Sequence, residues 1–195
     1  MKIRLARLPS ALFVPGAQAA NNSLLDGTYR ATVVQVCAES AASFTAEPEL
    51  AVNDAGGAWT YIETMRVTSV YNGRGGVTHS YSGTTIVQDY HPNTAQPITS
   101  FNGTCTGSYV AQNNRSFVLK SGSTCNATIT SGANAGETTS VTTTQDIAGQ
   151  MSMSRDSLVL TVDTPVEQLL TFNGSMKQYR RFCTLSHSAA KVRGN

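Results

Sequence analysis

A carboxylate and an imidazole, those of Glu63 and His79, lie on the apolar faces of two consecutive predicted strands. The odd positions of residues 58–71 are mostly large or apolar, whereas the even positions are mainly Thr. The odd positions also form the more apolar face of residues 77–88. A buried acid or imidazole with a shifted pKa can act as a general acid or base. These two residues are therefore candidate catalytic groups.

Their separation follows from the register that the intervening turn predicts. If Tyr71 pairs with Val77 across residues 72–76, both strands direct their odd positions to one face. Glu63 then lies about 10 Å along the strands from His79, at ~3.3 Å per residue. They are too far apart for a hydrogen bond, but both can line one cavity. In the alternative interpretation Glu63 reaches solvent and His79 is an ordinary structural residue.

Four larger side chains share this face and could line a ligand site: Trp59, Tyr61, Met65 and Tyr81. Aromatic walls with a few polar groups are typical of sites for small apolar or amphipathic molecules. The alternative is that these side chains simply fill a closed core. Motifs for common cofactors and for calcium are absent from the sequence, so we expect no cofactor.

Short segments of β-type sequence, separated by turn residues and without helical periodicity, follow one another along the chain. The predicted strands are residues 27–36, 58–71, 77–88, 98–110, 115–121, 124–130, 138–147, 150–155, 157–163, 166–172 and 177–186. A short helical turn is expected around residues 39–44. The pattern predicts an all-β fold: an antiparallel β-barrel of about eight to ten strands, or alternatively a β-sandwich.

The N-terminus resembles an export signal. Basic residues precede a short apolar stretch, and Ala17-Gln18-Ala19 fits the small-x-small cleavage pattern. We therefore expect a signal peptide at residues 1–19, a single domain at residues 20–195, and a secreted or periplasmic location.

Export would place the four cysteines in an oxidising compartment, where disulfides form. Sequence allows three pairings, of which we favour Cys37–Cys183 with Cys105–Cys125. The first bond would join the earliest strand to the last, and the second would span one hairpin region. A zinc site is the competing interpretation, but these cysteines lack the clustered spacing that zinc ligands show, so we expect no metal.

Charge argues against a polyanionic partner. Without Lys2, Arg4 and Arg7 the 14 basic residues fall to 11, against 12 acidic ones, so we expect no nucleic-acid binding. Apart from residues 1–19, the chain has no apolar stretch long enough for a spanning helix. Five basic residues gather near the C-terminus, and we interpret them as a solvated strand end: Lys177, Arg180, Arg181, Lys191 and Arg193. The sequence does not predict an oligomeric state.

Three short motifs together are familiar: residues 26–30 (DGTYR), 103–109 (GTCTGSY) and 179–185 (YRRFCTL). They resemble small secreted bacterial β-proteins, mostly uncharacterised, whose expected architecture is a calycin or allene-oxide-cyclase-like barrel. The resemblance implies a lipocalin-like barrel and supplies no catalytic residues.

Three functions remain open at this point. The first is an exported barrel that binds a small apolar or amphipathic ligand. The second is a cofactor-free cyclase, isomerase or hydrolase that uses Glu63 or His79. The third is a structural or interaction protein of the cell envelope, acting through its Thr-rich outer faces or its basic end.

Overall fold

The protein is all β, in a computed structural model that describes residues 20–40, 59–88, 98–162 and 164–193. The predicted signal peptide, residues 41–44 of the predicted helical turn and residues 89–97 lie outside this part. Glu39 and Ser40, placed in that turn by the sequence, are strand residues instead. One short 3-10 helix, η1 (Asn22–Leu24), precedes the first strand.

In the described part of the chain, eleven antiparallel strands form one sheet. They are β1 (Asp26–Ser40), β2 (Trp59–Asn72), β3 (Gly76–Gln88), β4 (Ile98–Ala111), β5 (Ser116–Leu119), β6 (Thr124–Ser131), β7 (Thr138–Thr143), β8 (Ile147–Met151), β9 (Ser157–Thr161), β10 (Val166–Phe172) and β11 (Lys177–Lys191). The expected all-β class is thus confirmed.

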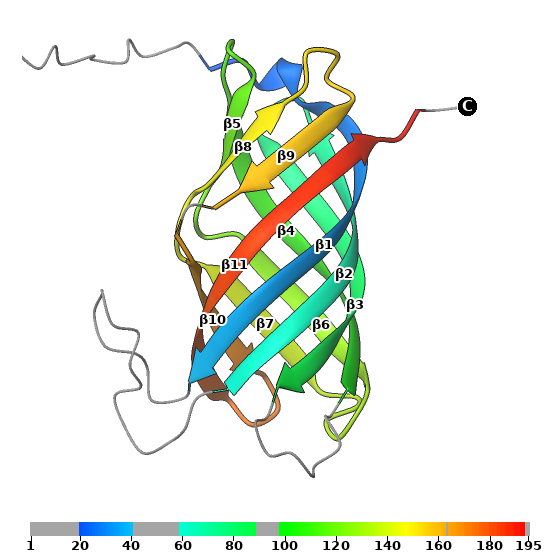
Figure 1. Cartoon of the computed structure of the whole chain (residues 1–195), viewed down its shortest axis with the longest axis vertical. Coiled ribbons are helices and arrows are strands. Elements are labelled where there is room, and N and C mark those ends of the chain that lie inside the picture. Colours follow the sequence, from blue (N-terminus) through cyan, green and yellow to red (C-terminus); the bar gives the residue numbers. More distant parts are fainter. Residues whose placement is uncertain (1–19, 41–58, 89–97, 163, 194–195) are drawn as a thin grey trace, which may run out of the picture.

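The sheet curls so that its first and last strands lie side by side (Figure 1). Five long strands are adjacent in the order β11, β1, β2, β3, β4. Two sets of short strands lead from β4 to β11: β5, β8 and β9 near η1, and β6, β7 and β10 toward the other end. The curled sheet therefore has two ends, which are built from different short strands.

Alternation decides which side chains face inward. From β1 to β3 the buried residues are at odd positions, as in Tyr29, Tyr61 and Val77, except for Ser40 at the end of β1. The pairing of Tyr71 with Val77 confirms the predicted register, including Glu63 opposite Thr85 and His79 opposite Ser69. Because side chains alternate along a strand, the Thr-rich even positions face outward.

Several predicted strands were wrong in their bounds. Those at residues 27–36 and 177–186 extend further, to Ser40 and Lys191, whereas two others are cut short. The predicted strand at residues 138–147 is interrupted after β7, where Asp146 accepts a hydrogen bond from the Ser121 amide at 2.7 Å. The predicted strand at residues 150–155 instead ends at Met151. There Ser152 Oγ accepts hydrogen bonds from the Asp156 and Ser157 amides, both at 3.2 Å. At both places a polar side chain accepts hydrogen bonds from backbone amides where the predicted strand would have continued.

A packed core fills the end of the sheet next to η1. Its fully buried members include Leu25, Tyr29, Tyr109, Phe117, Leu158 and Leu160. The Tyr109 hydroxyl donates to the Leu25 carbonyl at 2.5 Å, and the Tyr29 hydroxyl donates to the Arg155 carbonyl at 2.9 Å. The rings of these tyrosines fill the interior, and their hydroxyls bond to backbone carbonyls of the segments around Leu25 and Arg155.

Both disulfides join residues that are direct partners on neighbouring strands. Cys37 on β1 bonds to Cys183 on β11, and Cys105 on β4 bonds to Cys125 on β6. These are the pairings favoured from the sequence. The first bond links segments 146 residues apart, and it lies near the end of β1 that is away from η1, since Cys37 is three residues before the last residue of that strand.

Candidate ligand-binding site

The larger cavity lies inside the curled sheet, toward the end away from η1, with a volume of about 490 Å³. Its aromatic walls come from six side chains: Trp59, Tyr61, Tyr81, Phe101, Phe172 and Tyr179. Its aliphatic walls include Val87, Ile129, Val141 and Leu170. A concave, mainly apolar surface with a few polar groups is the usual setting for a small-molecule site.

A smaller cavity of about 190 Å³ continues toward the packed core. Met65, His79 and His187 are among its lining residues, together with the Cys105–Cys125 disulfide. Glu63, Tyr81, Val141 and Arg181 line both cavities. These four residues therefore form the boundary between the two spaces.

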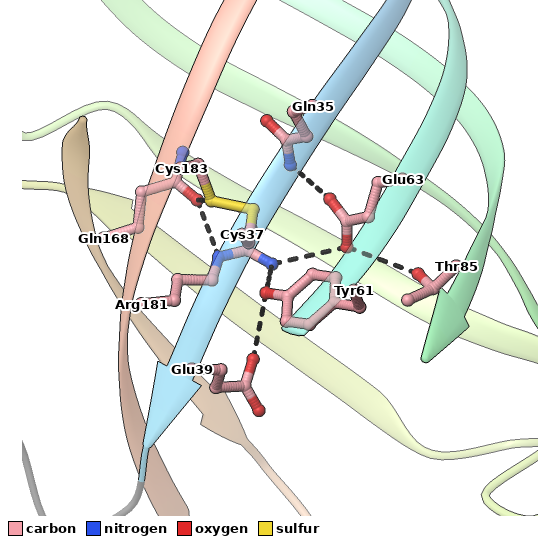
Figure 2. Close-up of polar contacts among 9 residues, drawn as sticks. All are labelled: Gln35, Cys37, Glu39, Tyr61, Glu63, Thr85, Gln168, Arg181 and Cys183. Atoms are coloured by element: carbon pink, nitrogen blue, oxygen red, sulfur yellow. Dashed lines mark hydrogen bonds and ion pairs between the residues drawn. A yellow bond between two sulfur atoms is a disulfide. The ribbon is translucent and has the colours of Figure 1, made fainter. Parts of the chain in front are cut away.

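Arg181 is the centre of a polar cluster at this boundary (Figure 2). The side chain projects inward from β11, and the residue is only 7% exposed. Its Nε donates to Gln168 Oε1 at 2.6 Å, and its Nη1 donates to the Tyr61 hydroxyl at 2.9 Å. Burial alone would lower the pKa of Arg181, but Tyr61 and the carboxylates of Glu63 and Glu39 outweigh it and raise the pKa. The guanidinium stays charged.

Glu63 is the carboxylate paired with this guanidinium. Its Oε1 lies 3.4 Å from Arg181 Nη1 and accepts a hydrogen bond from Thr85 at 3.3 Å. Its Oε2 accepts a hydrogen bond from the Gln35 amide. A buried carboxylate is tolerated when it is both paired and hydrogen-bonded, as here.

Glu39 is the second carboxylate of the cluster, and it is less well compensated. Its Oε2 accepts a hydrogen bond from the Tyr61 hydroxyl at 3.0 Å. Burial raises the pKa of Glu39, Arg181 and the Tyr61 hydrogen bond oppose that shift, and Glu63 adds to it. The effect of burial on the pKa of Glu39 is therefore larger than the opposing effect of Arg181 and Tyr61.

Two histidines lie in the smaller cavity without a positive charge. His79 Nδ1 is 2.7 Å from the Ser69 hydroxyl. His187 Nδ1 is buried and has no hydrogen-bond partner in the described part of the chain. Burial lowers the pKa of each imidazole to about 4, and for His79 the neighbouring His187 contributes. Both rings are therefore neutral at pH 7.

The structure places all the candidate residues predicted from sequence on the inner face. Trp59 and Tyr61 line the larger cavity, Met65 and His79 line the smaller one, and Glu63 and Tyr81 line both. Tyr81 packs directly over a glycine on the next strand: a Cβ at Gly103 would lie 2.6 Å from its hydroxyl. Glu63 and His79 thus share the smaller cavity, as the register predicted.

The interpretation of the basic C-terminal residues was wrong for Arg181. Its neighbour Arg180 does face outward and pairs with Glu167 at 3.3 Å, but Arg181 is inside the sheet. The two are consecutive in a strand and so point to opposite faces. Sequence reasoning also missed Gln35, Glu39 and Gln168. Alternation along the strands could have predicted that these side chains face inward. Gln35 and Glu39 are each two residues from Cys37, and Arg181 is two residues from Cys183, so each shares a face with an inward cysteine.

Comparison of the chain with protein-family models, curated proteins and solved structures found no match. The resemblance to small secreted β-proteins therefore stays a prediction. Within its described residues, the chain has no helix of the length and hydropathy needed to cross a bilayer.

Proposed function

We propose that this protein is an exported β-barrel that binds a small apolar or amphipathic ligand in its larger cavity. One observation carries the proposal: about 490 Å³ of interior space is walled by aromatic and aliphatic side chains, with a charged cluster at one side. Side chains fill the interior near η1, so the hollow is confined to one end of the same sheet. Such a shape suits a molecule with an apolar body and a polar group.

Export is part of this proposal. The signal-like residues 1–19 and two disulfides are both compatible with an oxidising compartment outside the cytoplasm. Mass measurement of the mature protein from the source cells checks this, and we expect a chain that begins at Ala20.

Blocking the cavity provides the direct test of binding. Ala127 lines the larger cavity from β6, so Ala127→Phe introduces a ring into it. Thr128, the next residue, faces solvent, and Thr128→Phe is the matched control. The uncharged apolar probe N-phenyl-1-naphthylamine serves as ligand. Its binding is followed by quenching of Trp59, the chain's single tryptophan, at the cavity wall.

We expect the probe to bind the unmodified protein and the Thr128→Phe variant. Ala127→Phe should weaken binding by about tenfold or more, corresponding to at least ~1.4 kcal/mol. Thermal melts of both variants establish that they fold. Failure of the unmodified protein to bind the probe, or equal weakening in both folded variants, would overturn the proposal.

The enzyme alternative uses Glu63 or His79 as acid or base, and the Ser69 hydroxyl lies 2.7 Å from His79 Nδ1. Two observations favour binding over catalysis. Burial lowers the pKa of His79 to about 4, so the imidazole is a weak base at pH 7. Glu63 already accepts hydrogen bonds from Gln35, Thr85 and Arg181.

A further inference from the structure

The charges that line the larger cavity do not balance. Its described lining has two carboxylates, Glu39 and Glu63, and one guanidinium, Arg181. Arg181 is directly paired with Glu63, at 3.4 Å. One negative charge therefore remains when both carboxylates are ionised, and it is on Glu39.

The hydrogen bonds lead to the same residue. Glu63 accepts hydrogen bonds on both of its oxygens, from three different side chains. Glu39 accepts from the Tyr61 hydroxyl alone among the described residues, although a carboxylate has about four acceptor positions. Tyr61 does not contribute a charge to its hydrogen bond with Glu39. Burial raises the pKa of Tyr61 well above the usual value, so the phenol is neutral. Glu39 retains the capacity to accept more hydrogen bonds.

Aromatic rings stand beside this carboxylate. Glu39 on β1 lies opposite Trp59 on β2, and the Trp59 ring meets Tyr179 edge-to-face with centroids 6.1 Å apart. Tyr179 in turn meets Phe172 at 5.6 Å. All four residues line the larger cavity. Ring faces attract cations within about 6 Å of their centroids, and they also give an apolar body a surface to pack on.

We infer that the larger cavity binds an organic amine: an ammonium group that pairs with Glu39 beside the Trp59 and Tyr179 rings, on a hydrocarbon body that packs against Phe101, Ile129 and Leu170. The ammonium supplies the positive charge that the described lining lacks and offers up to three hydrogen-bond donors. A carboxylate ligand would place a third anion in the same space, beside a guanidinium that is already paired. This inference rests on the proposed function and specifies its ligand.

Three ligands of equal chain length provide the test: decylamine, decanol and decanoate, titrated into the oxidised full-length mature protein by calorimetry at pH 7, below micelle-forming concentrations. We expect decylamine to bind at least about tenfold more tightly than decanol, and decanoate to bind most weakly. Glu39→Gln should reduce the amine-to-alcohol affinity ratio to near one. Glu167→Gln, which alters an outward-facing carboxylate, should leave that ratio unchanged.

The outcomes separate the two proposals. If decanol and decylamine bind equally, or if decanoate binds most tightly, the amine inference is overturned while ligand binding stands. If none of the three ligands binds, the proposed function itself is overturned. The ranking in the unmodified protein needs no variant, so it remains decisive even if Glu39→Gln does not fold.

Discussion

The two ends of the curled sheet differ in how their interiors are filled. Near η1, Leu25, Tyr109 and Phe117 are completely or almost completely buried. At the other end, the buried apolar cluster consists of Tyr61 and the Cys37–Cys183 disulfide, with Val87 packed against it. The space left there is the larger cavity. One sheet thus carries a packed core at one end and a hollow at the other.

This difference shows how a small β-protein can combine stability with an open interior space. Close packing contributes most where side chains interdigitate, because each buried side chain gains many short contacts. A hollow forgoes those contacts, so other interactions must hold its walls. Here the walls are joined by a disulfide and by the Arg181 cluster, which links β1, β2, β10 and β11. Variants at the two ends should therefore change the free energy of unfolding by different amounts.

Removal of the disulfide at the hollow end should have the largest effect. We expect Cys37→Ala with Cys183→Ala to lower the free energy of unfolding by about 5 kcal/mol, because the bond closes a loop of 146 residues. Cys105→Ala with Cys125→Ala, which opens a 20-residue separation, should cost about 3 kcal/mol. Urea unfolding measures both. Equal losses would contradict the view that loop closure stabilises the hollow end.

Truncation of one phenylalanine at each end compares the two interiors directly. Phe117 is 0% exposed, and its ring packs over Gly149, so Phe117→Ala should cost about 4 kcal/mol. Phe172 lines the larger cavity, so part of its ring faces open space and makes no packing contacts that truncation would remove. We expect Phe172→Ala to cost about 1 kcal/mol. Similar losses in urea unfolding would indicate that the second end is packed as well.

The histidines of the smaller cavity should make the fold sensitive to acid. Each imidazole has a pKa of about 4 in the fold and about 6.5 in the unfolded chain, because burial disfavours the cation. The unfolded state therefore binds more protons as pH falls from about 6.5 to 4, and each histidine lowers the free energy of unfolding by about 3 kcal/mol over that range. The loss should end below pH 4, where the folded form also binds the proton.

His187→Leu isolates one histidine's share of that loss. Its buried Nδ1 has no described partner, so the substitution removes a desolvated polar atom and should cost little stability at pH 7. Urea unfolding from pH 7 to 4 should show a drop smaller by about 3 kcal/mol than in the unmodified protein. An unchanged drop would mean that His187 is protonated inside the fold, and hence that the smaller cavity is well solvated.

Much of this arrangement was predictable from local sequence. The period of two along residues 58–71 and 77–88 identified the inward face, and the turn between these segments set their register. The inward placement of Glu63, His79, Tyr61 and Tyr81 follows from those two features alone. Strand ends were less predictable, because side chains such as Ser152 and Asp146 bond to backbone that lies several or many residues away.

The sequence by itself determined the class of fold and the inward face of the second and third strands, since a strand's alternation is a local property. It allowed three cysteine pairings, and the pairing of β1 with β11 and of β4 with β6 selected one of them. Only the tertiary structure decided that Arg181 meets Glu63, which lies 118 residues earlier, and that the interior is packed at one end and hollow at the other. The physical reason is that such neighbours and volumes depend on how the first and last strands pair and on how many side chains share the space they enclose. Neither quantity is a property of any single segment.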